Sequence, residues 1–181
     1  LFPRRSATGM SWTTLLQPNL IVQGNILALT PDRVAEHGLR GLILDVDETL
    51  LPASAGEVSP ELKAWIEAFQ PNVKLWLVTN NVNLPRIRRI SEELKIPFFV
   101  GAAKPSRRKL RKAAEAMNLP VEQLGIVGDR LFTDVLGGNR LGLFTILVDP
   151  IYASPHPQRH PPYWVRRLEL SLSRLLGIKI Q

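Results

Sequence analysis

The stretch GLILDVDETLLP, residues 41–52, ends a continuous apolar run in three carboxylates within four residues. The apolar run does not alternate with polar residues, which is typical of a strand that is buried on both faces of a parallel sheet. Asp45, Asp47 and Glu48 follow this strand directly, where charge is costly unless a cation or hydrogen bonds neutralise it. The stretch therefore predicts a buried strand that ends at a functional site.

The same alternation of a strand and a helix continues to residue 149. Because the loops between these segments are short, the pattern predicts an α/β, Rossmann-like three-layer sandwich with a mostly parallel five-stranded sheet. Strands are predicted at residues 39–47, 73–80, 97–101, 123–129 and 143–149, and helices at 59–70, 84–95, 105–118 and 131–142.

The segments on either side complete what we expect to be one structural domain. Residues 1–40 form a predicted N-terminal arm that packs on the core and ends in a short helix at 30–38, and residues 41–149 form the core. Residues 150–181 begin with a proline-rich arm. An amphipathic helix follows at 163–176, and it either docks on the core or lies in a membrane interface with Trp164 among the headgroups.

Composition narrows the function classes. The chain has 181 residues, of which 45% are hydrophobic, and a net charge of +7, which favours anionic partners. It contains no cysteine, which excludes disulfides, thiolate zinc sites and cysteine nucleophiles. No apolar run approaches the roughly 20 residues that span a bilayer, and the N-terminal stretch lacks the apolar segment of a secretory signal, so we expect a cytoplasmic location.

Polar side chains stand at successive strand ends. Asp45 and Asp47 end the first core strand, and Thr79 and Asn80 end the second. Each could be an ordinary turn residue or cap on its own. Ligands bind beyond the carboxyl ends of parallel strands, however, and turn residues have no reason to assemble one coherent chemistry. The full set comprises Asp45, Asp47, Thr79, Asn80, Lys104, Asp129 and Asp134.

The chemistry that uses this set is phosphoryl transfer through an aspartyl-phosphate. Asp45 and Asp129 can hold Mg²⁺, which prefers oxygen ligands, and Lys104 can offset the charge of the carboxylates and of the phosphate. Thr79 can donate a hydrogen bond to a phosphoryl oxygen. Asp47 can protonate the leaving alkoxide and later deprotonate water.

The motifs DVDET, TN, KP and GDRLFTD resemble the four motifs of the haloacid dehalogenase (HAD) superfamily of phosphohydrolases. The resemblance implies that Asp45 is the nucleophile and Asp47 the general acid and base. It also implies that Thr79, Asn80 and Lys104 bind the phosphate, with Thr79 and Lys104 in catalytic roles. Residues 45, 47, 129 and 134, all aspartates, are the expected metal ligands for Mg²⁺.

The connections from Asp47 to Thr79 and from Asn81 to Lys104 are too short for a cap domain, so the site should be open. The whole chain is similar to the class IIIA, YqeG-like phosphatases, which include phosphatidylglycerophosphate phosphatases. This similarity implies hydrolysis of phosphatidylglycerophosphate in phospholipid biosynthesis, with an anionic phospholipid substrate, peripheral contact with the membrane surface and no nucleic-acid partner.

Other functions remain open from sequence alone. An open, basic site also suits a phosphatase that acts on nucleic-acid ends or on a phosphoprotein. A phospho-receiver module uses aspartates, a threonine and a lysine on a parallel sheet, but here nothing acidic ends the second strand. A scaffold-like homologue is disfavoured by the intact motif residues.

Overall fold

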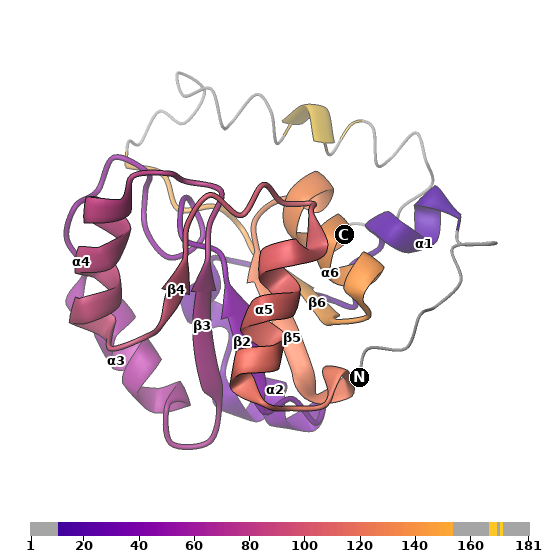
Figure 1. The fold of residues 1–181 in the computed structure, drawn as a ribbon, viewed down its shortest axis with the longest axis horizontal. Coiled ribbons are helices and arrows are strands. Elements are labelled where there is room, and N and C mark those ends of the chain that lie inside the picture. The colour runs from indigo at the N-terminus through magenta and orange to yellow at the C-terminus, as the bar shows by residue number, and fades with distance from the viewer. Residues whose placement is uncertain (1–10, 154–166, 170, 172–181) are drawn as a thin grey trace.

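A computed structural model of the chain describes residues 11–153, 167–169 and 171. In this part of the chain, one sheet of six parallel strands has the order β1-β6-β5-β2-β3-β4 (Figure 1). β2 lies inside the sheet between β5 and β3, as its continuous apolar sequence predicted. The strands are β1 (Leu20–Ile21), β2 (Gly41–Leu44), β3 (Lys74–Val78), β4 (Phe98–Phe99), β5 (Leu124–Gly128) and β6 (Phe144–Leu147).

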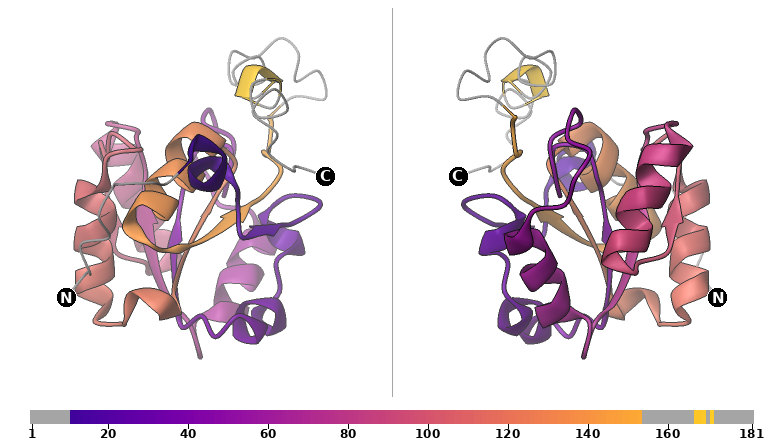
Figure 2. Two further views of the ribbon diagram at one scale, coloured as in Figure 1. Left: turned by 90° about the vertical axis from the view of Figure 1, so that its right-hand side faces the viewer. Right: turned by 90° about the vertical axis from the view of Figure 1, so that its left-hand side faces the viewer.

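Helices cover both faces of the sheet and make three layers (Figure 2). Leu42 and Leu44 of β2 pack toward α3 (Pro60–Phe69) and α4 (Leu84–Leu94), whereas Ile43 points to the opposite face and packs toward α5 (Arg107–Met117). One face carries η1 (Ile26–Ala28), α2 (Pro31–Glu36), α3 and α4. The other carries α1 (Trp12–Leu16), α5, the π-helical turn η3 (Leu131–Val135) and α6 (Leu136–Leu141), with the 3₁₀ turn η2 (Val121–Gln123) after α5.

The helices begin where the sequence places a cap. Ser59 accepts a hydrogen bond from the Leu62 N–H at the start of α3, and Thr30 accepts one from Arg33 at the start of α2. A proline occupies the first turn of both helices, where no intrahelical N–H is needed. These local signals explain why the boundaries of both helices were predictable.

The N-terminal arm supplies a sixth strand that the sequence did not predict. Leu20 and Ile21 of β1 pair in parallel with Ile146 and Leu147 of β6. Asn19 fixes the start of this pairing, because its side-chain oxygen accepts a 2.8 Å hydrogen bond from the Thr145 N–H. A strand of two residues is too short to show a period, so only the tertiary pairing reveals it.

Within the described residues, no helix is long and apolar enough to cross a membrane. Most of the predicted helix at 163–176 lies outside the described residues, although positions 167–169 and 171 are helical.

Candidate active site

The hydrogen bonding between β2 and β5 continues as far as Asp45, the first candidate catalytic residue. Leu44 of β2 lies beside Val127 of β5, and the Asp45 N–H continues the ladder with a 3.0 Å hydrogen bond to the Val127 carbonyl. Asp129 is the first residue after β5, and its carboxylate lies within 4.8 Å of the carboxylate of Asp45 at the end of the neighbouring strand. The chain leaves β2 and β5 toward opposite sides of the sheet, which makes this pair of strand ends a topological switch point.

Lys104 joins two of the predicted aspartates. Its Nζ lies 2.7 Å from Oδ1 of Asp45 and 2.6 Å from Oδ1 of Asp134. All three residues are buried. Burial alone would lower the pKa of Lys104, but the carboxylates of Asp134 and Asp45 outweigh it and raise that pKa to about 12. The lysine is therefore a permanent cation in this site.

The same environment acts on Asp45 in the opposite sense. Burial raises the pKa of Asp45 to about 7, although the Lys104 ammonium opposes the shift. The neighbouring carboxylate of Asp134 adds to the increase. A further cation beside Asp45 would favour its ionised, nucleophilic form.

Asn80 fixes the position of Lys104 through the main chain. Its Oδ1 accepts a 2.6 Å hydrogen bond from the Lys104 N–H, and its Nδ2 donates a 3.1 Å hydrogen bond to the Lys104 carbonyl. In this structure Asn80 thus orients the lysine, while its predicted contact with substrate remains a prediction.

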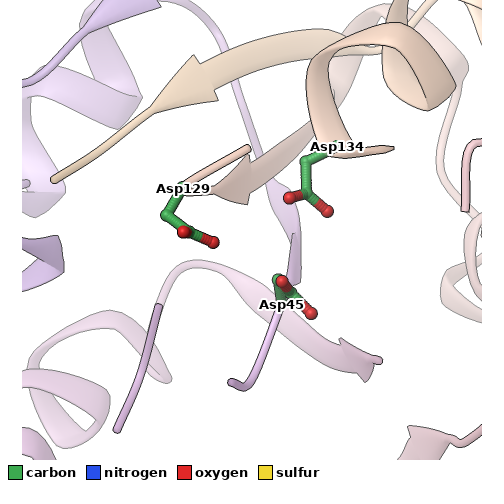
Figure 3. Close-up of side chains that lie close together, drawn as sticks. All are labelled: Asp45, Asp129 and Asp134. Atoms are coloured by element: carbon green, nitrogen blue, oxygen red, sulfur yellow. The ribbon is translucent and has the colours of Figure 1, made fainter. Parts of the chain in front are cut away.

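The carboxylates of Asp45, Asp129 and Asp134 converge on one point (Figure 3), and Lys104 contacts two of them. Oxygens of Asp45, Asp129 and Asp134 lie within 4.8 Å of one another, and all three residues are buried. Three buried carboxylates exceed the charge of one lysine, and all the donors are oxygens, which suits a hard divalent cation. The residues present therefore fit a divalent metal site.

Asp134 reaches this cluster because Gly128 has no side chain. A Cβ at Gly128 would lie 2.3 Å from Cγ of Asp134, so any larger residue would displace the carboxylate. Thr49 contributes on the other side, where its hydroxyl donates a 3.2 Å hydrogen bond to Oδ1 of Asp129.

Asp47 has a separate set of partners. Its Oδ1 accepts a 2.6 Å hydrogen bond from Nη1 of Arg86, and its Oδ2 accepts a 2.8 Å hydrogen bond from Nδ2 of Asn81. The Thr79 hydroxyl lies 3.4 Å from the same Oδ2. Asp47 is not one of the three residues of the acidic cluster, so its predicted role as a metal ligand remains a prediction.

Arg86 also holds the loop that follows Asp47. Nε donates to the Ala55 carbonyl at 2.9 Å, and Nη2 donates to the Pro52 carbonyl at 3.1 Å. Glu48, the third carboxylate of the opening stretch, has a φ of 62° and accepts a hydrogen bond from the Ala53 N–H, so it shapes this turn. The connection between Asp45 and α3 is thereby pinned to α4 and contains no cap, as predicted.

Sequence reasoning missed the roles of Arg86 and Asn81. In the sequence, Arg86 stands close to two other arginines, Arg88 and Arg89, and nothing in this basic stretch singles it out. A usable signal was present, because Asn83 caps α4 and Pro85 stands in its first turn. The first turn of a helix that follows a strand end faces the site edge of a parallel sheet.

Glu169 is a third residue whose role the sequence did not reveal. It is buried, its Oε1 lies 3.2 Å from Nη2 of Arg130, and its Oε2 accepts a 3.3 Å hydrogen bond from the Leu131 N–H. Burial raises the pKa of this carboxyl, although Arg130 opposes the shift. The sequence left two alternatives for the C-terminal helix, docking on the core or lying in a membrane interface. The helical turn at residues 167–169 contacts the core, because Glu169 bonds to the loop directly after Asp129.

Comparisons with known proteins relate this chain to phosphatases and hydrolases. The HAD-hydrolase-like family matches residues 101–165. A probable phosphatase, YqeG, from Bacillus subtilis is 40% identical over 131 residues, which cover 72% of this chain and 76% of the relative.

A more distant relative carries a more specific name. The chloroplastic phosphatidylglycerophosphate phosphatase 1 of Chlamydomonas reinhardtii is 31% identical over 147 residues, which cover 72% of this chain. The match spans only about half of that protein, 54% of its length.

Among solved structures, the cobalt-bound deoxy-D-mannose-octulosonate 8-phosphate phosphatase from Haemophilus influenzae has a similar fold. Its TM-score is 0.52 at 15% identity, over 64% of this chain and 81% of that one. This similarity concerns the fold alone.

Proposed function

We propose a reaction for this chain, which belongs to the YqeG-like phosphatases of the HAD superfamily: hydrolysis of phosphatidylglycerophosphate to phosphatidylglycerol and inorganic phosphate. The observation that carries the reaction type is the buried arrangement of Lys104 between Asp45 and Asp134, beside Asp129. Family membership also argues against the receiver-like and scaffold-like alternatives.

In the first half-reaction, a carboxylate oxygen of Asp45 attacks phosphorus. A bond from this oxygen to phosphorus forms, and the bond from phosphorus to the lipid alcohol oxygen breaks. Asp47 donates a proton to the departing oxygen. Lys104 and the hydroxyl of Thr79 stabilise the charge on the other phosphoryl oxygens.

In the second half-reaction, a water molecule attacks phosphorus of the aspartyl-phosphate. Asp47 now accepts a proton from that water, and the bond between phosphorus and Asp45 breaks to release inorganic phosphate. Arg86 and Asn81 orient the ionised form of Asp47 that accepts this proton, because each donates to one of its two carboxylate oxygens.

We assign the acidic cluster to Mg²⁺, with Asp45, Asp129 and Asp134 as the side chains that would hold it. When bound, the cation supplies positive charge that screens the approach of an anionic phosphate to an anionic nucleophile. Oxygen donors suit Mg²⁺, and Lys104 already balances part of the carboxylate charge.

Two observations support a lipid phosphate as the substrate. The connections around the site contain no cap, since only residues 45–59 lie between β2 and α3, and only residues 79–83 lie between β3 and α4. An open site accepts a headgroup that remains in a bilayer more readily than a closed one does. The phosphatidylglycerophosphate phosphatase of Chlamydomonas reinhardtii, about half of whose length matches this chain, provides the second, more specific support.

The test is phosphate release from phosphatidylglycerophosphate in mixed detergent micelles, with Mg²⁺ and with EDTA. We expect Mg²⁺-dependent turnover that Asp45→Asn abolishes. Asp32→Asn, an exposed change in the first turn of α2, is the matched control and should retain wild-type turnover.

Two outcomes would contradict the proposal. Near-normal turnover by Asp45→Asn would remove the nucleophile assignment. Turnover of a 5′-phosphorylated oligonucleotide with none of the lipid would show that the substrate is a nucleic-acid end.

A further inference from the structure

The loop between β3 and α4 exposes two aliphatic side chains beside the candidate active site. Val82 is 80% exposed and Leu84 is 39% exposed. Val82 directly follows Asn81, whose amide donates to the carboxylate of Asp47. A single exposed valine is unremarkable on a protein surface, so the position and the neighbours of this pair decide its meaning.

A cation flanks the pair on the α5 side. A Cβ built at Gly101 would lie 3.4 Å from Cγ1 of Val82 and 3.8 Å from Nζ of Lys109, so both side chains meet over this glycine. The Lys109 ammonium donates to the carbonyl of Val100, which holds it at the loop rather than along the helix.

A second cation flanks the pair on the α4 side. Leu84 and Arg88 are four residues apart on α4, so they are neighbours on one face of the helix. Arg88 is exposed. An aliphatic centre between two cations thus stands at the edge of the sheet that holds Asp45 and Asp47.

This pattern matches the requirements of an anionic bilayer. Burial of aliphatic side chains at the boundary between headgroups and acyl chains is favourable in free energy, and adjacent cations attract anionic headgroups. A nucleic-acid surface would instead use aromatic platforms or hydrogen-bonding groups, and Val82 and Leu84 offer neither.

We propose that Val82, Leu84, Arg88 and Lys109, here called the rim surface, bind an anionic lipid bilayer and hold the active site against its headgroups. This inference rests on the proposed function, because a lipid phosphate brings the enzyme to such a surface. The rim surface then delivers substrate without extracting it from the membrane.

The test compares vesicle binding with soluble turnover, using the full chain. Vesicles contain either equal parts of phosphatidylglycerol and phosphatidylcholine or phosphatidylcholine alone. We expect the double variant Val82→Ser/Leu84→Ser to partition about tenfold more weakly onto the anionic vesicles, since two aliphatic side chains no longer enter the bilayer. Hydrolysis of p-nitrophenyl phosphate should be unchanged, because neither residue contacts the reacting groups.

Leu27→Ser is the matched control, since Leu27 is 38% exposed but lies on η1. It should bind vesicles like the wild type. Arg88→Gln/Lys109→Gln should reduce the preference for anionic vesicles, on the order of fivefold for each charge.

Unchanged vesicle binding by the double serine variant would overturn the proposal. The proposal would also be overturned if the double serine variant lost binding to a single-stranded oligonucleotide while its vesicle binding stayed intact. That result would assign the rim surface to nucleic acid. Failure of the proposed function is separate, because it would appear as absent phosphatidylglycerophosphate turnover in detergent micelles, where no bilayer is needed.

Discussion

Arg86 and Asp47 form an ion pair of 2.6 Å between the first turn of α4 and the residue two positions after Asp45. The side chain of Arg86 is 12% exposed and that of Asp47 is 22% exposed, so the pair is only partly screened by water. The remaining guanidinium donors hold the carbonyls of Pro52 and Ala55. One side chain therefore fixes both the proposed acid and the loop beside it.

Arg86→Lys should slow turnover by about 10- to 100-fold, because an ammonium cannot hold Asp47 and two carbonyls at once. The effect should be large for an alkyl phosphate, whose leaving group needs a proton, and smaller for p-nitrophenyl phosphate. Steady-state kcat values for both substrates measure this, with exposed Arg88→Lys as the control on p-nitrophenyl phosphate. An equal loss on both substrates would mean that Arg86 does not assist the protonation of the leaving group by Asp47.

Lys104→Met should lower the free energy of unfolding by about 3–5 kcal/mol in EDTA, because it leaves buried carboxylates without their cation. Mg²⁺ should then raise the Tm more in this variant than in the wild type, since the cation becomes the main counter-charge. Thermal melts with and without Mg²⁺ measure both effects. Lys112→Met, an exposed change on α5, should leave the melts unaltered. An equal Mg²⁺ response in Lys104→Met and wild type would argue against a cation in the acidic cluster.

Gly128→Ala should cost about 1–3 kcal/mol in the free energy of unfolding, since the new methyl group would lie 2.3 Å from Cγ of Asp134. Displacement of Asp134 should also remove the Mg²⁺-dependent rise in Tm. Urea unfolding and thermal melts test the two parts. Gly137→Ala is the control, because its methyl group would approach the flexible end of the Leu110 side chain at 3.1 Å and the Pro105 Cα at an ordinary contact distance of 3.5 Å. If Gly128→Ala changed neither the free energy of unfolding nor the Mg²⁺-dependent rise in Tm, the tight contact between Gly128 and Asp134 would be contradicted.

Glu169 gives a prediction for pH. Burial raises its pKa above the ordinary 4.5, so its contribution to stability is complete below pH 4.5 and declines as the pH rises through the folded-state pKa. Glu169→Gln does not titrate. The stability of this variant relative to wild type should therefore increase from pH 4.5 toward neutral pH, as urea unfolding at several pH values would show. A difference that is constant with pH would contradict the shift.

Much of the fold followed from local sequence. Ser59 and Pro60 mark the start of α3, and the unbroken GLIL of β2 indicates burial on both faces, so these elements needed no tertiary information. β1 escaped prediction because two residues carry no period, and its pairing with β6 joins segments more than 120 residues apart.

The residues of the candidate site also divide into those that the sequence could place and those that it could not. Asp45, Lys104, Asp129 and Asp134 could be placed because the carboxyl ends of parallel strands share one edge. Arg86 could not, because its partners Asp47, Pro52 and Ala55 depend on how α4 lies against the loop after β2. The contact of Glu169 with Leu131 likewise depends on where the chain returns after 38 residues.

That return has a practical consequence for handling the protein. Because Glu169 is bonded to Arg130 and Leu131, a load applied to the chain downstream of Glu169 is transmitted to the turn that carries Asp129. An anchoring group for surface immobilisation, or a bulky fusion partner, would apply such a load. Tethered measurements of binding or turnover should therefore attach the molecule through the opposite end of the chain.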